Sequence, residues 1–102
     1  MAAFVFFDVR EIRDQELLSS YRGKVFETVE RFGGRYRVLG AMEEKLEGDW
    51  VPAIPVLIEF PDSDTAKAWY ESDIYAPLKK DRTAAALCDA VLLGGFDHQP
   101  GG

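Results

Sequence analysis

The sequence contains one cysteine and one histidine in 102 residues. A single thiol, Cys88, excludes an intrachain disulfide and is typical of a reducing compartment. With His98 as the one imidazole, the chain lacks the ligand set of a zinc or iron site, so we expect no metal and no cofactor. The sequence also has no glycine-rich phosphate loop, no dinucleotide fingerprint and no serine-elbow motif. These absences remove the common sequence signatures of metal, nucleotide and serine enzymes.

Basic residues are also scarce, with 12 Lys and Arg against 18 Asp and Glu, for a net charge of −6. Nucleic-acid binding needs a clustered basic surface, so we expect no nucleic-acid partner. No apolar run approaches the roughly 20 residues of a membrane-spanning helix, and we expect no membrane partner. The first residues lack the basic start of a signal peptide. Together with the lone thiol, these features predict a cytoplasmic protein.

The sequence contains enough hydrophobic residues to form the core of one folded domain. Hydrophobic residues make up 47% of the chain and aromatic residues 13%. The length is that of a single domain, which we assign to residues 1–97, followed by a flexible Gly/Pro tail over 98–102. A domain this small has a high ratio of surface to volume, so burying a further face in a dimer would stabilise it.

Hydrophobic periodicity predicts the order strand, helix, strand, strand, helix, strand. We expect strands over 3–9, 35–39, 53–60 and 90–96, and helices over 14–32, from Asp62 or Ser63 onward, and from Pro77 to about Ala86. Pro55 favours an edge position or a bulge in the third strand. This order predicts an α+β fold, the ferredoxin-like βαββαβ antiparallel sheet with helices on one face.

The first strand and the first helix carry the clearest patterns. Phe4 and Phe6 alternate with Val5 and Phe7, so both sides of the strand are apolar. A strand with one solvent-exposed face would alternate apolar with polar residues. We therefore expect helices on one face of the sheet and a second subunit's sheet on the other, as in a homodimeric α+β barrel.

The helix over 14–32 has a predicted N-cap at Asp14 and a glycine stop at Gly33. Between these ends, apolar residues recur at helical spacing and fall on one arc of the helix. The arc comprises Leu17, Leu18, Tyr21, Val25, Thr28, Val29 and Phe32. Tyr21 therefore points inward, toward the sheet.

Several segments carry a family likeness along nearly the whole chain, roughly 3–96. After an early helix with a tyrosine come GGRY (33–36), LEGDW (46–50), LIEFP (57–61) and AKAWYESDIYAPLKKDR (66–82). In this order they resemble the bacterial family called domain of unknown function 1330. The resemblance implies the dimeric α+β barrel superfamily, and thus a fold and a homodimer. It implies no particular reaction, because distant relatives include cofactor-free monooxygenases, isomerases, haem-binding proteins and stress-induced proteins.

This chain departs from the family pattern at the end of the first helix. The family resemblance implies a histidine just before the double glycine in many members. This chain has Phe32 at that position. The resemblance therefore implies no acid–base role for residue 32 of this chain. His98, in the predicted tail, is either a solvated terminal residue or a group that reaches a pocket across the dimer. Cys88 is either a small core or edge residue or a nucleophile without a recognisable partner.

One set of aromatic and charged residues is the candidate site. In a ferredoxin-like dimer, a cavity can form between the helices and the sheet. Tyr36, Trp50, Trp69 and Tyr75 would shape such a pocket. Arg82 would hold an anion, and Tyr21 or Glu59 would exchange a proton. On this hypothesis the protein binds or converts a small aromatic or carboxylate metabolite without a metal.

The alternative hypothesis makes the same residues structural. Glu59 needs a partner if it is buried, and Arg82 is the natural one, as a bidentate pair. The aromatic residues would then be core, since buried pairs perturb pKa values without being catalytic. The protein would be a non-catalytic dimeric binding or stress-associated module. The sequence leaves open whether Glu59 and Arg82 neutralise each other or line a cavity, and hence whether the protein is an enzyme.

Overall fold

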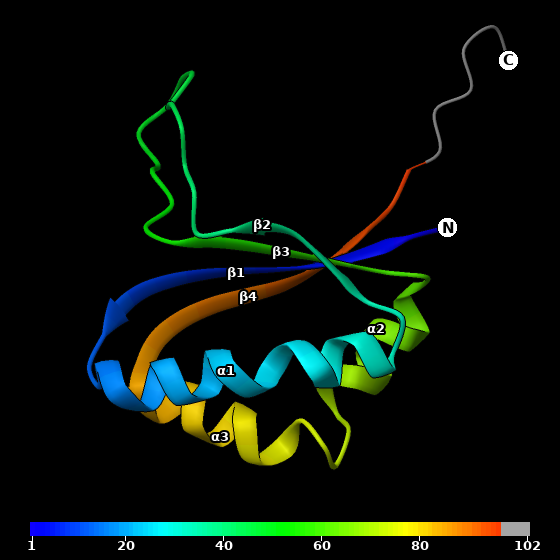
Figure 1. Ribbon diagram of the computed structural model, residues 1–102. Coiled ribbons are helices and arrows are strands. Elements are labelled where there is room, and N and C mark those ends of the chain that lie inside the picture. The colour runs from blue at the N-terminus through cyan, green and yellow to red at the C-terminus, as the bar shows by residue number, and fades with distance from the viewer. Residues whose placement is uncertain (97–102) are drawn as a thin grey trace, which may run out of the picture.

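The computed structural model of the protein describes residues 1–96 and confirms the ferredoxin-like α+β fold. The elements are β1 (Ala3–Ile12), α1 (Gln15–Arg31), β2 (Arg35–Leu39), β3 (Pro55–Phe60), α2 (Ser63–Tyr70), α3 (Ala76–Ala85) and β4 (Ala86–Gly94). The strands form one antiparallel sheet in the order β2-β3-β1-β4. Figure 1 shows all three helices against one face of this sheet. The predicted tail, 98–102, and His98 lie outside the described residues.

β1 runs through the middle of the sheet and has two apolar faces, as predicted. Val5 and Phe7 point toward the helices and are buried in the core. Phe4 and Phe6 point to the opposite face, which we call the open face because no helix covers it. On that face, Phe6 lies between Leu57 of β3 and Val91 of β4. The sheet therefore buries one apolar face and presents a second.

α1 begins and ends where its cap residues predict. The Asp14 carboxylate accepts a hydrogen bond from Leu17 N at 3.0 Å, which satisfies one of the free N–H groups of the first turn. Gly33 follows the helix with φ +72°, a conformation that favours glycine. The predicted inward stripe is buried at Leu18, Tyr21, Val25, Thr28 and Val29. This stripe holds α1 against the sheet and places Tyr21 between the two layers.

α2 supplies the largest buried side chain of the core. Trp69 is fully buried, with its ring 5.3 Å from Phe60 and 4.2 Å from Tyr75, measured between ring centroids. Its indole Nε1 donates to Thr28 Oγ1 at 3.1 Å, so the buried N–H has an acceptor. Asp62 caps α2 by accepting from Thr65 N at 2.7 Å. Trp69 therefore joins α2 to α1 and to the sheet.

Four strand boundaries differ from the sequence-based expectation. Two of them are strand ends, because β1 continues to Ile12 and not only to residue 9, and β4 ends at Gly94 and not at residue 96. β4 begins at Ala86, directly after α3, and not at residue 90. Alanines favour a helix there, but β1 continues to Ile12 and pairs with Ala86, so sheet pairing overrides the local preference. β3 begins at Pro55, which lies neither on an edge strand nor in a bulge, because β3 pairs with both β2 and β1. The irregularity lies in β2, between Tyr36 and Val38.

A long loop, residues 40–54, connects β2 to β3 without regular secondary structure. Figure 1 shows it projecting from the sheet on the side opposite the helices. Its end is tied to β1, because the buried Asp8 accepts hydrogen bonds through Oδ1 from Ala53 N at 2.8 Å and Ile54 N at 3.2 Å. Within the loop, Trp50 packs edge-on against Phe6, with ring centroids 6.4 Å apart. The loop is thus continuous with the open face.

Among the described residues, no helix is long and apolar enough to cross a membrane.

Candidate functional site

A small cavity of about 40 Å³ lies between the helices and the sheet. Its polar lining residues are Tyr21, Arg22, Tyr36 and Arg82. The rest of its wall is apolar and consists of Phe7, Val9, Leu18, Val25, Phe26, Leu39, Val56 and Ile58. The cavity adjoins a wider hollow of about 470 Å³, with which it shares Arg22, Phe26, Leu39 and Val56. We call the first the inner cavity and the second the outer hollow.

Arg82 is the most unusual residue of the inner cavity. It comes from α3, is 5% exposed, and lies over the Phe7 ring at 4.8 Å. Its Nε donates to Tyr75 Oη at 3.2 Å. None of the ion pairs formed among residues 1–96 includes Arg82. Buried charges in proteins are normally paired, so this guanidinium has an unfilled requirement for an anion.

The phenols around Arg82 remain neutral at ordinary pH. Burial raises the pKa of Tyr21 and of Tyr36, and burial is also the largest cause that raises the pKa of Tyr75. Burial lowers the pKa of Arg82, but the neighbouring Tyr75 and Tyr21 raise it by more, so the guanidinium stays charged. The inner cavity therefore presents one buried cation beside neutral hydroxyl groups that can donate hydrogen bonds.

These groups can hold an anion. A guanidinium has five N–H donors in a planar fork that matches a carboxylate, and the hydrogen bond to Tyr75 uses only one of them. In the described part of the chain, no Asp, Glu or His lines the inner cavity or the outer hollow. Likewise, residues 1–96 contain no group of three His, Cys, Asp or Glu side chains placed to hold a metal ion. The site can stabilise negative charge, but it offers no carboxylate or imidazole as a base.

Glu59 lies on the other side of the sheet from Arg82, which corrects the pairing considered from the sequence. Ile58 is buried against the helices, so the next side chain, Glu59, points to the open face. There it accepts a hydrogen bond from Arg37 Nε at 3.0 Å. Glu59 therefore neither neutralises Arg82 nor lines the same cavity.

The other candidate residues divide between three places. Tyr21 and Tyr36 line the inner cavity together with Arg82. Tyr75 lies fully buried behind it and forms a hydrogen bond with Tyr21, with 2.9 Å between the phenol oxygens. Trp69 belongs to the core, and Trp50 lies exposed beside the open face. The structure thus brings Tyr21, Tyr36, Tyr75 and Arg82 together and separates Glu59 and Trp50 from them.

Sequence reasoning missed two residues of the cavity wall, Arg22 and Phe26. They lie one turn apart on α1, beside the inward stripe, and both line the inner cavity and the outer hollow. Phe26 packs against Tyr36, with ring centroids 4.5 Å apart. The available signal was their position at the border of the apolar arc, directly after Tyr21 and Val25. Hydrophobic periodicity predicts that residues at the border of the apolar arc are solvent-exposed, although such residues can line a cavity.

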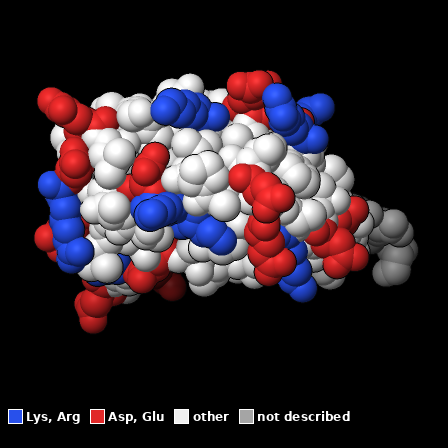
Figure 2. All heavy atoms as spheres, turned by 90° about the horizontal axis from the view of Figure 1, so that it is seen from below, with Lys and Arg blue, Asp and Glu red and all other residues white. Residues whose placement is uncertain are grey.

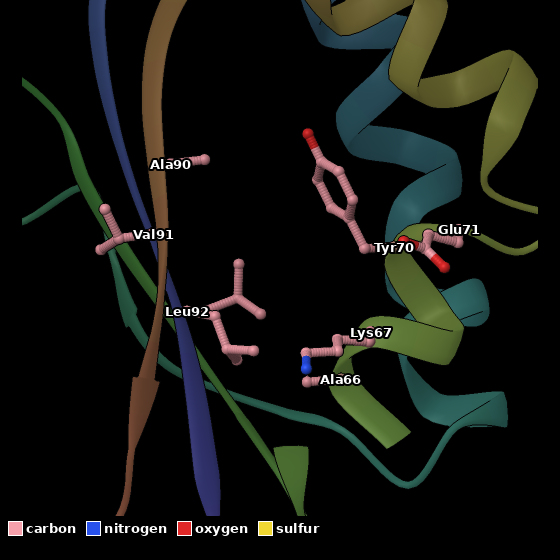
Figure 3. A pocket seen from close by; sticks show the side chains of 8 residues that line it. Ala66, Lys67, Tyr70, Glu71, Ala90, Val91 and Leu92 are labelled. Carbon is pink, nitrogen blue, oxygen red and sulfur yellow. The ribbon is translucent and has the colours of Figure 1, made fainter. Parts of the chain in front are cut away.

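A second hollow, of about 200 Å³, lies between α2 and β4. Figure 3 shows Lys67 and Tyr70 of α2 on one side, with Ala90 and Leu92 of β4 facing them. Its charged residues, Lys67 and Glu71, are exposed and of opposite sign. No buried charge points into this hollow from the described residues, so it is the weaker candidate for a site.

The outer surface over the helices carries mixed charges. Figure 2 shows Lys and Arg side chains on this face interspersed with Asp and Glu. The inner cavity, by contrast, has arginines and no acidic side chain among the described residues that line it. Its positive charge is therefore a local property of the site.

Comparison with known proteins identifies the family and the fold. The chain matches the family described as domain of unknown function (DUF1330) over residues 2–96. It resembles the structure of RPA0582, a protein of unknown function from Rhodopseudomonas palustris, with a TM-score of 0.72, 19% identity, and coverage of 95% of this chain and 84% of that one.

Two further structures are similar. A dimeric ferredoxin-like protein of unknown function from Jannaschia sp. CCS1 has a TM-score of 0.67 at 9% identity, covering 93% of this chain and 100% of that one. SnoaB, a cofactor-independent oxygenase from Streptomyces nogalater, has a TM-score of 0.60 at 15% identity, covering 97% and 96%. At identities this low the likeness shows the fold alone.

None of the curated proteins matches the chain. The family match, in contrast, spans all seven elements of the fold, from β1 to β4. The protein thus belongs to the DUF1330 family, a family of unknown function, and has a ferredoxin-like α+β fold.

Proposed function

We propose that the protein is a cytoplasmic homodimer that binds a small organic anion, the carboxylate or enolate of an aromatic metabolite, with its anionic group in the inner cavity and without a metal. The observation that carries this proposal is the state of Arg82. It is buried, it lines a cavity, and it has no acidic partner among residues 1–96. A ligand anion would satisfy this charge, which residues 1–96 leave without an ion-pair partner.

The surroundings of Arg82 indicate how such an anion binds. The guanidinium takes the anionic oxygens, and Tyr21 and Tyr36 donate from their neutral phenols. Phe26 and Val56, which line both the inner cavity and the outer hollow, offer apolar surface to the body of the ligand. Small-molecule sites typically combine an apolar wall with a few polar groups that fix orientation.

Conversion of the ligand would depend on the stabilisation of negative charge. Oriented donors that meet a developing anion lower the barrier of reactions that pass through enolates or oxyanions. Because its pKa is raised, Tyr21 stays protonated and serves as a hydrogen-bond donor, and not as a base. A cofactor-independent oxygenation, the activity named for SnoaB, is one reaction type for which a bound carbanion or enolate is a chemically suitable intermediate.

Binding without conversion is the second candidate function. The observation that favours it is that no carboxylate or imidazole of the described residues lines the inner cavity. Without such a residue, the base that abstracts a proton would have to be a group of the substrate or a solvent molecule. The protein would then be a dimeric binding module for the same class of anion.

The homodimer is supported by the open face. This face carries Phe4, Phe6, Leu57, Val91 and Leu93, with Trp50 beside it. Val91 is 50% exposed and Leu93 46% exposed, so the apolar surface is available to a partner. A second copy placed by a two-fold axis would cover it with the same residues. The similar protein from Jannaschia sp. CCS1 is described as dimeric.

Calorimetric titration with benzoate tests the anion site. The wild-type protein should bind benzoate, and Arg82→Lys should weaken binding by about 10-fold or more, because lysine lacks the planar fork of donors. Arg31→Lys is the matched control, since Arg31 is exposed on α1 and pairs with Glu27. Circular dichroism would confirm that each variant is folded. Equal benzoate binding by wild type and Arg82→Lys, or no binding by the wild type, would contradict the proposal.

A further inference from the structure

We infer that the preferred ligand is a dianion, with two negative groups joined by an apolar body. Arg82 binds one group in the inner cavity, and Arg22 binds the other at the boundary with the outer hollow. This inference rests on the proposed function, because it takes the anion site at Arg82 as given.

Arg22 is the second cation of the site and has no acidic partner in the described chain. It is half-buried, it lines both compartments, and no ion pair among residues 1–96 includes it. The positions three and four residues away on α1 are Leu18, Ser19, Val25 and Phe26, none of them acidic. Arg31, on the same helix, pairs with Glu27 at 3.2 Å. Arg22 thus differs from an ordinary surface arginine of α1.

The two compartments set the length of the ligand. The inner cavity, about 40 Å³, has room for one or two waters at about 30 Å³ each, which suits a carboxylate and is too small for a ring. The outer hollow, about 470 Å³, has room for a ring. Phe26, Leu39 and Val56 line both compartments and form their shared apolar wall. A ligand with one group at Arg82 and its ring in the outer hollow would lie along this wall and meet Arg22, which also lines both compartments.

Charge balance favours two anionic groups over one. The described lining residues of both compartments include two arginines and no acidic side chain. A monoanion at Arg82 would leave the charge of Arg22 without a partner in the site. A partly enclosed cation is screened less by salt than an exposed one, so a second carboxylate at Arg22 should add measurable affinity.

Terephthalate, which is benzene-1,4-dicarboxylate, and its monomethyl ester are a matched pair of probes. They share the ring and one carboxylate, and differ in whether the second carboxyl group is charged. Calorimetry at low ionic strength should show that wild-type protein binds terephthalate about 10-fold more tightly than the ester. Arg22→Gln should reduce this ratio to about one, because terephthalate loses more affinity than the ester. Lys24→Gln removes an exposed charge from the same helix and should preserve the ratio.

The outcomes separate this inference from the proposed function. Equal affinity of the wild type for the two probes, or a preference for terephthalate that survives in Arg22→Gln, overturns the dianion. In either case the proposed function stands if Arg82→Lys still weakens binding of the ester. If neither probe binds to the wild type, the anion site at Arg82 is wrong as well.

Discussion

Arg82 Nε donates a hydrogen bond to Tyr75 Oη at 3.2 Å, and Tyr75 Oη lies 2.9 Å from Tyr21 Oη. Since Tyr75 accepts from Arg82, the Tyr75 hydroxyl is free to donate to Tyr21. Either hydroxyl can be the donor in this pair, and where Tyr75 donates, the Tyr21 hydroxyl is left to donate into the inner cavity, which Tyr21 lines. The fully buried Tyr75 thus orients both groups that meet a ligand anion.

The hydrogen bonds that link Arg82, Tyr75 and Tyr21 predict which substitution lowers the free energy of unfolding more. Tyr75→Phe removes the acceptor of Arg82 and the partner of Tyr21, so it should lower the free energy of unfolding by about 2–3 kcal/mol. Tyr21→Phe removes only the outer hydroxyl and should cost about 1 kcal/mol. Urea denaturation of the two variants measures both values. Equal losses, or a larger loss in Tyr21→Phe, would contradict the role given to Tyr75.

Trp69 provides a prediction about the core. Thr28→Val keeps the branched shape of residue 28 but removes the acceptor of the Trp69 indole N–H. A buried donor without a partner costs about 1–3 kcal/mol, so the variant should be less stable by that amount. Thr83→Val, at an exposed position of α3, is the control. If the two substitutions have the same effect in urea denaturation, the Trp69–Thr28 hydrogen bond does not stabilise the fold.

The raised tyrosine pKa values predict how stability changes with alkaline pH. Unfolded tyrosines ionise near pH 10, whereas burial raises the pKa values of Tyr21 and Tyr36 above that in the folded state. Above about pH 10 the unfolded chain therefore binds fewer protons than the folded chain, and stability falls as pH rises. Below that pH this contribution is fully present.

Phenolate absorbance checks this expectation. In the folded protein it should rise less near pH 10 than in the urea-unfolded protein, and the remaining rise should coincide with unfolding seen by circular dichroism. Identical titration curves for the folded and the unfolded protein would show that Tyr21 and Tyr36 are not shielded.

The open face predicts the effect of an added charge. Leu93→Asp places a carboxylate on this face, where a second copy would bury it, so the dimer should dissociate. Ser19→Asp adds the same charge to an exposed position of α1 and should leave the dimer intact. Sedimentation velocity distinguishes the two species. A Leu93→Asp protein that remains dimeric would place the interface elsewhere.

The sequence predicts the local features of the fold well because they depend on near neighbours. Asp14 and Gly33 mark the ends of α1, and the structure confirms both. The alternation of Phe4 and Phe6 with Val5 and Phe7 predicts the two apolar faces of β1, and the register confirms it. Each of these signals depends on residues a few positions apart.

The site depends on which face of the sheet the helices cover, and alternation does not give that information. Both faces of β1 are apolar, so nothing in the strand itself favours one face for the helices. Glu59 was therefore considered as a partner of Arg82, although the two lie on opposite sides of the sheet. The start of β4 at Ala86 was missed for a related reason, because it depends on pairing with Ile12, far away in the sequence.

The most direct test of the anion site is native mass spectrometry of the purified protein and of its Arg82→Lys variant. The account predicts a dimer of the wild type that retains the mass of a small acid, or takes up added benzoate, and a dimer of Arg82→Lys that does neither. Retention of the same ligand by Arg82→Lys would contradict the central role of Arg82. A monomeric wild type would contradict the proposal that a second copy covers the open face.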